Sequence, residues 1–136
     1  TSDYVFDWSS MLSFEGNTAP YLMYAYARIR SILRKQELGL ENIQITTATE
    51  AAERYLLLKI LQLPEIVDMV ARDCYPNFLC TYLYELAGLF MRFYESCPIL
   101  KAEPKLRDSR LALSALAAAT LQQGLGLLGI ETLEQM

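Results

Sequence analysis

Apolar side chains recur every three to four residues along most of the chain, which is the spacing that one face of an α-helix requires. The clearest case is the stretch 19–36, whose apolar set is Leu22, Ala25, Ile29, Ile32 and Leu33. The strict alternation that is typical of half-buried β-strands is nearly absent. The periodicity therefore predicts an all-α fold.

Capping and helix-breaking residues divide the chain into separate helices. Gly16 ends what precedes it, Asn17 or Thr18 can cap the helix over 19–36, and Pro20 suits a first helical turn. A loop is expected over 37–48. Further helices are predicted from Thr49 to a break near Pro64, over 64–73, from an Asn77 cap to about 97, and over 105–127. Short connections place consecutive helices side by side, so we predict an antiparallel bundle of four to five helices.

The predicted helix that follows Asn77 has its own apolar face. Its members are Leu79, Leu83, Leu86, Phe90, Phe93 and Tyr94, and all six are expected to lie in the core. The stretch from Leu111 to Ile130 has no charge over about the length that spans a bilayer, but it contains Ser, Thr, two Gln and three Gly. A buried core helix is therefore favoured there, and no membrane span is expected.

Bulk composition restricts the class of protein. The chain has 136 residues, 53% of them hydrophobic, and a net charge of -4, which fits one soluble domain without a global basic field. It begins with Thr1 and lacks a basic segment followed by an apolar run, so no signal peptide is expected. Three cysteines and no histidine predict buried, inert thiols in a reducing cytoplasm, with neither a disulfide framework nor a zinc site.

A second arc of the helix over 19–36 carries residues that a core does not need. Tyr21, Tyr24, Arg28, Ser31 and Lys35 fall about 110° round the helix from the apolar arc at 100° per residue. Four of the 12 basic residues and none of the 16 acidic residues lie between positions 16 and 36. Positive charge is thus concentrated here although the whole chain is acidic.

Rings interleaved with guanidinium groups suit the binding of unstacked nucleotide bases. Each ring offers a stacking face worth about 1–3 kcal/mol per base, and the cations hold adjacent phosphates. Two other interpretations stay open: the tyrosines form the half-buried rim of the core, or the stripe packs on another protein or domain as part of a helical scaffold. The charge pattern alone does not decide between them.

Three stretches resemble the C-terminal end of bacterial arginyl-tRNA synthetases. They read "FDWSSMLSFEGNTAPYLMYAYARIRSI" at 6–32, "LCTYLYELAGLFMRFYESCPIL" at 79–100 and "SRLALSALAAATLQQGLGLLGIETLEQM" at 109–136. The similarity covers essentially the whole chain, and "SFEGNTAPYL" together with a terminal "LLGIE…M" is a specific pair. The resemblance implies a helical anticodon-binding domain of the type named for a DALR motif.

The resemblance also implies which side chains contact RNA. Tyr21, Tyr24, Arg28 and the terminal Met136 would contact the splayed anticodon bases. Arg30 and Lys35 of the same helix are assigned as secondary phosphate contacts. The DALR motif itself is present only loosely, as the four residues 108–111, "DSRL", and we expect no role for them beyond building the last helix.

Further expectations concern the parent enzyme. Residues 1–18 would form the junction with a catalytic domain, and 19–136 the anticodon-binding domain. The parent, a class I arginine–tRNA ligase, would use ATP with Mg to join arginine to tRNA(Arg) in the cytoplasm as a monomer. This chain contains neither HIGH nor KMSK, and its "GLGLLG" ends a helix rather than opening one. It is therefore expected to be non-catalytic, without a cofactor or metal of its own, and to contact the anticodon loop and its own catalytic domain.

Overall fold

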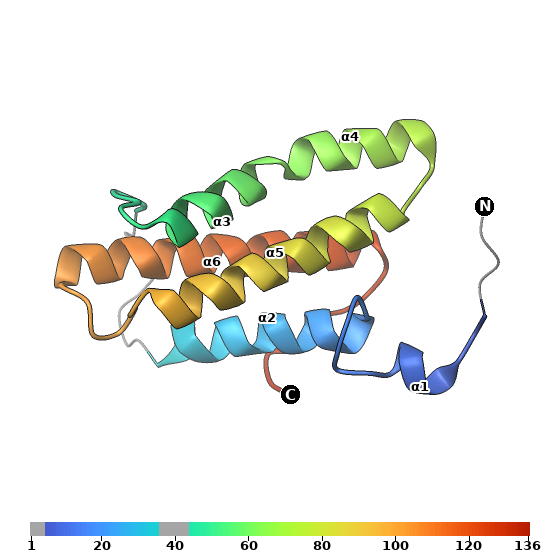
Figure 1. Ribbon diagram of the computed structural model, residues 1–136, viewed down its shortest axis with the longest axis horizontal. Helices are drawn as coiled ribbons and strands as arrows, with labels where there is room; N and C mark the ends of the chain where they lie inside the picture. Colours follow the sequence, from blue (N-terminus) through green and yellow to red (C-terminus); the bar gives the residue numbers. More distant parts are fainter. Residues whose placement is uncertain (1–4, 36–43) are drawn as a thin grey trace.

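The computed structural model describes residues 5–35 and 44–136, and within them all regular structure is helical (Figure 1). A single turn, α1 (Trp8–Met11), precedes five longer helices: α2 (Ala19–Arg34), α3 (Ala51–Leu61), α4 (Leu63–Asp73), α5 (Asn77–Ser96) and α6 (Pro104–Leu127). The predicted all-α bundle is confirmed. Of the loop predicted over 37–48, the part up to residue 43 lies outside the described residues.

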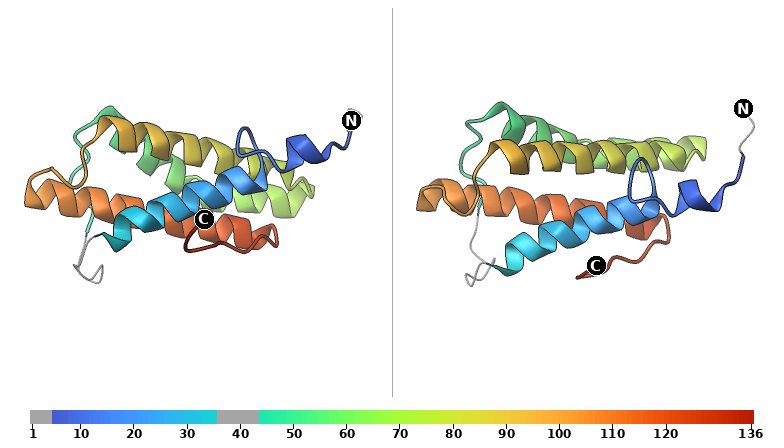
Figure 2. Two further views of the ribbon diagram at one scale, coloured as in Figure 1. Left: turned by 90° about the horizontal axis from the view of Figure 1, so that it is seen from below. Right: turned by 60° about the horizontal axis from the view of Figure 1, so that its bottom comes forward.

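The long helices lie along one axis, and successive helices mostly run in opposite directions (Figures 1 and 2). Helix α2 packs on α6 and α5, while α3 packs on α5 and α6, and α4 continues the direction of α3 and packs on α5. The break between α3 and α4 falls at Gln62, and Pro64 lies in the first turn of α4, as predicted. Proline is tolerated there because first-turn amides have no helical acceptor.

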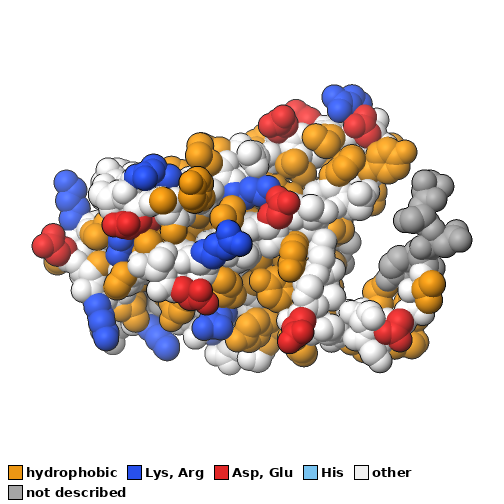
Figure 3. Space-filling view, viewed as in Figure 1, with side chains coloured by type: hydrophobic (Ala, Val, Ile, Leu, Met, Phe, Trp, Pro, Cys, Tyr) orange, Lys and Arg blue, Asp and Glu red, His pale blue; other side chains and the backbone are white. Residues whose placement is uncertain are grey.

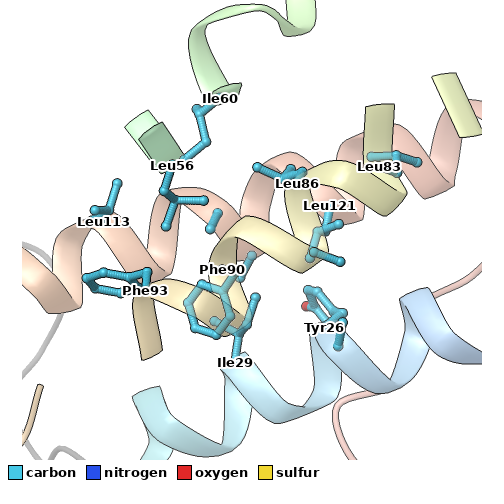
Figure 4. Packing of buried hydrophobic residues seen from close by; sticks show 14 of the residues in the cluster. Tyr26, Ile29, Leu56, Ile60, Leu83, Leu86, Phe90, Phe93, Leu113 and Leu121 are labelled. Carbon is cyan, nitrogen blue, oxygen red and sulfur yellow. The ribbon is translucent and has the colours of Figure 1, made fainter. Parts of the chain in front are cut away.

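The core lies where α2, α3, α5 and α6 meet (Figure 4). All five apolar residues predicted for the inner face of α2 are buried, and Phe90 and Phe93 of α5 are completely inaccessible to solvent. Burying a side chain of this size contributes about 1.5–3 kcal/mol, so this face fixes how α2 is rotated about its axis. The arc of α2 that carries Tyr24 and Arg28 is thereby directed away from the core.

Three local predictions are wrong. Tyr94, expected in the core, is exposed and stacks on Phe90 from outside, with ring centroids 6.4 Å apart. Asn77 is the first residue of α5 rather than its cap, and its side chain makes no capping hydrogen bond. Of the three thiols only Cys97 is buried, whereas Cys80 is half-buried and Cys74 is exposed.

A buried ion pair joins the start of α3 to α6. Arg110 Nε lies 2.6 Å from Glu53 Oε1, and the two side chains are 6% and 1% exposed. Arg110 Nη1 also donates to the carbonyl of Pro98 at 2.7 Å, and the amide of Glu50 donates to Glu53 at 2.9 Å. Burial alone would raise the pKa of Glu53, but the hydrogen bonds from Glu50 and Arg110 hold that pKa below its ordinary value.

Ser109, which like Arg110 belongs to the stretch that corresponds to the DALR motif, makes a second link between α6 and the segment before α3. Its hydroxyl accepts from the amides of Thr46 and Thr47 and donates to the carbonyl of Thr47 at 2.9 Å. Ser109 therefore holds the segment that leads into α3, and Arg110 holds α3 itself. The expectation that the stretch 108–111 only builds the last helix is wrong.

Two features are absent from the described ranges, 5–35 and 44–136. No helix there is long and apolar enough to cross a membrane. Nor do three or more His, Cys, Asp or Glu side chains there lie close enough together to hold a metal ion.

We predict that Glu53→Ala lowers the free energy of unfolding by about 3–5 kcal/mol, because it leaves the guanidinium of Arg110 buried without its counter-charge. Urea denaturation followed by circular dichroism measures the loss. The double variant Glu53→Leu/Arg110→Met should recover most of it, and Glu65→Ala on the exposed face of α4 serves as the control. A loss below about 1 kcal/mol for Glu53→Ala, the range of a surface pair, would contradict a structural role for the buried pair.

Candidate nucleic-acid interface

The start of α2 is fixed by the sequence that precedes it. Gly16 adopts φ +79°, a conformation that favours glycine, and the chain then turns so that Thr18 becomes the N-cap. The Thr18 hydroxyl accepts from the amide of Tyr21 at 3.2 Å and donates to the carbonyl of Ser13. This cap ties the segment that contains Phe14 to the first turn of α2.

The tail that follows α6 is turned back by a glycine. Gly129 has φ +75°, its amide donates to the carbonyl of Gly126, and the amide of Ile130 donates to the carbonyl of Leu125 at 2.9 Å. These two bonds form a Schellman motif, in which a left-handed residue reverses the chain after a helix. The tail consequently runs back along α2 towards the C-terminus (Figures 1 and 2).

One carboxylate holds this tail on α2. Glu134 accepts a hydrogen bond from the Tyr26 hydroxyl at 3.0 Å and from Arg30 Nε at 2.9 Å, and Arg34 Nη1 donates to its backbone carbonyl. Tyr26, Arg30 and Arg34 are four residues apart, so they lie above one another on one side of α2. We call Glu134 and these three residues the tail clamp. The clamp leaves Leu133, Gln135 and Met136 to line the space beside α2.

Two pockets adjoin one another between α2 and the tail. The first, about 420 Å³, is lined by Tyr24, Ala27, Arg28, Ser31, Arg34, Gln135 and Met136. The second, about 640 Å³ and mostly apolar, is lined by Phe14, Tyr21, Tyr24, Leu133, Gln135 and Met136. Tyr24, Gln135 and Met136 belong to both, and residues Tyr24 and Met136 are 39% and 55% exposed. A ring and a thioether are thus presented to solvent at the boundary between the two pockets.

Arg28 is held beside this boundary by two rings. Its Nη1 donates to the Tyr24 hydroxyl at 3.3 Å, and its guanidinium carbon lies 5.6 Å from the centroid of the Tyr94 ring on α5. A cation over an exposed ring is stabilised by about 0.5–1 kcal/mol, enough to bias the orientation of a long side chain. The group therefore has a preferred position without losing its access to solvent.

The predicted site residues differ in their surroundings. Tyr24, Arg28 and Met136 meet at one pocket, and Tyr21 lines the adjoining one, half-buried against Tyr84 at 5.5 Å between ring centroids. Arg30 is engaged by Glu134, so its assignment as a phosphate contact stays a prediction beside an observed structural role. Lys35 is exposed at the C-cap of α2 and lines neither pocket.

Several residues of this surface were not found from the sequence. Glu134 and Arg34 belong to the clamp, Phe14 lines the apolar pocket, and Tyr94 supports Arg28. The spacing of Tyr26, Arg30 and Arg34 indicates a second functional side of α2, although no local pattern shows that its partner is an acid a hundred residues away. In the space-filling view, Lys and Arg side chains occur along the edge where α2 lies, beside apolar ones (Figure 3).

Exposed rings and an oriented guanidinium group around adjoining pockets are typical of surfaces that bind unpaired nucleotides. Comparison with known families is more specific, because residues 22–136 match the family described as the DALR anticodon binding domain. The chain belongs to this family.

Similar proteins agree with this assignment. The chain is 56% identical to proteins named arginine–tRNA ligase from a Marinomonas species and from Saccharophagus degradans, over all of its own length and 24% of theirs. Among solved structures, an arginyl-tRNA synthetase of Thermus thermophilus matches 92% of the chain and 22% of its own with a TM-score of 0.83 and 39% identity. One from Plasmodium falciparum matches 99% and 24% with a TM-score of 0.90 and 34% identity. The chain thus spans about a quarter of the length of the relatives it matches.

We predict that Glu134→Gln loosens the tail, because the neutral amide cannot form the ion pairs with Arg30 and Arg34. Backbone order parameters from NMR relaxation over 131–136 should fall, whereas Glu131→Gln, an exposed change in the same segment, should leave them unaltered. The hydrogen bond from Arg30 is the largest of the influences that hold the pKa of Glu134 below its ordinary 4.5. The wild-type tail should therefore stay ordered at neutral pH and lose its order only as the pH falls through that lowered pKa. Equal order parameters in both variants would show that the clamp does not hold the tail.

Proposed function

We propose that this chain binds the anticodon loop of tRNA(Arg) as one domain of an arginine–tRNA ligase. The observation that carries the proposal is the meeting of Tyr24 and Met136 at the boundary of two solvent-open pockets, with Arg28 in the wall of one of them. These three side chains come from the two ends of the chain, and a core that only packed would not need to expose them together. The family and the named relatives support the same ligand.

Each group has a distinct task in this proposal. Anticodon bases leave their stack and rest on the Tyr24 ring and on the thioether of Met136, while Tyr21 closes the apolar pocket. Arg28 donates to a phosphate or to the edge of a base, since its guanidinium carries more donors than the Tyr24 hydroxyl uses. The loop that fits these positions makes the rest of the tRNA dock productively, so binding energy is spent on specificity.

The chemistry of the ligase would lie outside this chain. In the complete protein, ATP with Mg and arginine would be bound by another domain, and no step of the reaction is assigned to a residue described here. We further propose that the complete protein is a cytoplasmic monomer, as the resemblance implies.

The segment before α2 is suited to contact that other domain. Val5, Phe6, Trp8, Leu12 and Phe14 are all more than half exposed, and the Phe6 and Trp8 rings pack edge to face at 4.9 Å between centroids. Exposed apolar side chains in such a run are typical of a covered surface in the complete molecule. We therefore propose 1–18 as the junction with the catalytic domain and 19–136 as the anticodon-binding domain.

The second candidate function is a helical scaffold that binds another protein or domain through the same aromatic stripe. The exposed rings and the net charge of -4 favour it. The two functions differ in their response to salt, because contacts to phosphates release counterions and an apolar interface does not. Salt dependence of binding is therefore the property to measure.

We predict that Tyr24→Ala in the complete protein weakens tRNA(Arg) binding by roughly 5- to 150-fold, the equivalent of one lost base stack of about 1–3 kcal/mol. Tyr24→Phe keeps the ring and should stay within a few-fold of wild type. Tyr55→Ala on α3, which removes an even more exposed ring from outside the pockets, is the control. Fluorescence anisotropy with a labelled transcript measures all four proteins. Equal affinity of the two alanine variants would argue against stacking on Tyr24.

We also predict that Arg28→Ala weakens tRNA binding and makes the slope of log affinity against log salt shallower by about 0.7, one phosphate contact to a single strand. Arginine and ATP affinities of the complete protein should be nearly unchanged. Arg72→Ala on α4 removes an exposed guanidinium of the same kind from the opposite part of the bundle and is the control. An equal loss of affinity for all three ligands, or a slope that does not change, would reject the assignment.

A further inference from the structure

A third pocket lies on the other side of Tyr21, between α2, α3 and α5. It measures about 400 Å³, and its walls include Tyr21, Lys59, Tyr84, Gly88, Leu89 and Arg92. Of its wall residues, only Tyr21 belongs to the anticodon contacts proposed above, and none is fully buried in the bundle core. We call it the Tyr84 pocket.

Three residues one helical turn apart define its α5 side. Tyr84, Gly88 and Arg92 lie above one another, because every fourth residue of a helix returns to nearly the same side. The Tyr84 side chain is 38% exposed, and Arg92 is exposed as well. On this side of α5 a ring and a guanidinium group therefore lie about two turns apart, with a residue that has no side chain midway between them.

The glycine in the middle is not required by the fold. Glycine costs about 1 kcal/mol relative to alanine inside a helix, so its presence calls for a reason. At Gly124 of α6 the reason is packing, because an added Cβ would lie 2.5 Å from Leu83. At Gly88 an added Cβ would meet no atom within 4 Å, and the backbone there is not left-handed. What Gly88 does provide is the open space between Tyr84 and Arg92.

One of the two cations that line the pocket has no counter-charge among the described residues. Glu85 forms an ion pair with Lys59, whose amine also lies 5.2 Å from the Tyr82 ring. The Arg92 guanidinium has no ion pair or hydrogen bond within residues 5–35 and 44–136. An exposed ring face, a gap and an uncompensated guanidinium together match a planar base that carries a phosphate.

We propose that the Tyr84 pocket binds one further nucleotide of the same RNA strand, with the base on the Tyr84 ring and a phosphate on Arg92. This inference rests on the proposed RNA function. The argument for RNA as occupant is continuity: Tyr21 lines both the Tyr84 pocket and the apolar pocket of Tyr24 and Met136. A strand that crosses α2 at Tyr21 passes directly from one set of contacts to the other.

The test uses the complete protein and a tRNA(Arg) transcript in the anisotropy assay. Gly88→Gln places a side chain in the gap from a position where the Cβ itself meets no atom within 4 Å, and it should weaken binding by roughly 5- to 150-fold, the loss of one base stack. Gly88→Ala should bind within a few-fold of wild type and unfold at a slightly higher temperature. Arg92→Gln should weaken binding and make the salt slope shallower by about 0.7. Ala71→Gln and Arg72→Gln, both exposed on α4, are the matched controls.

Tyr24→Ala in the same assay separates this inference from the proposed function. If Tyr24→Ala weakens binding while Gly88→Gln and Arg92→Gln match their controls, the Tyr84 pocket does not bind RNA and the proposed function still stands. If none of the three weakens binding, both fail. If Gly88→Gln lowers the unfolding temperature of the complete protein at unchanged tRNA affinity, another domain covers the pocket and the inference is overturned.

A crosslink provides a readout that folding defects do not imitate. A photoreactive benzoyl-phenylalanine in place of Tyr84 should attach to one nucleotide next to those that the same replacement of Tyr24 reaches. Attachment to protein alone, with no crosslinked RNA, would overturn the inference.

Discussion

The 3.6-residue period of α2 is the constraint on which the candidate nucleic-acid interface depends, because it gives three sides of one helix three different partners. The apolar side is buried against α5 and α6, and this burial fixes the rotation of the helix. About 100° further round, Tyr26, Arg30 and Arg34 face the tail and bind Glu134. The third side, with Tyr24, Arg28 and Ser31, is left to line a pocket. A rotation of α2 that moved any of these residues to another side would also take its apolar residues out of the core.

The polar links inside the bundle support the same interface indirectly, because they fix the helices that contact α2. Ser109 and Arg110 bind the segment before α3 and Glu53 within it, so α3 is fixed on α6 through buried hydrogen bonds as well as apolar contacts. Breaking such a pair is costly even where an apolar pair of the same size would serve. The links hold α3 and α6 against α5, whose Tyr94 and Tyr84 rings in turn contact Arg28 and Tyr21 of α2. The sequence stretch that corresponds to the DALR motif thus acts as internal scaffolding.

Local sequence was enough for the helices and for the exposed arc of α2, because caps, prolines and apolar periodicity act within a few residues. It was not enough for contacts between distant segments. Tyr94 lies next to Phe93 in an apolar pattern, and only the position of α2 decides that its ring is left outside. Glu134 reads as one more acid in an acidic chain until the reversal at Gly129 brings it to Arg30. Such contacts depend on the direction of a whole helix, which no local window contains.

The clamp has an electrostatic consequence as well as a geometric one. Glu134 is an anion placed within a group of cations, and by pairing with Arg30 and Arg34 it reduces the field that this side of α2 projects into solvent. The attraction of cations to phosphates does not depend on the nucleotide sequence, whereas contacts with the edges and faces of the bases do. A surface with fewer uncompensated cations therefore binds RNA less tightly but depends more on whether the bases fit. Under the proposed function, which requires other RNA loops to be rejected, an acidic chain with the Arg28 guanidinium in the wall of one pocket is a physically reasonable compromise.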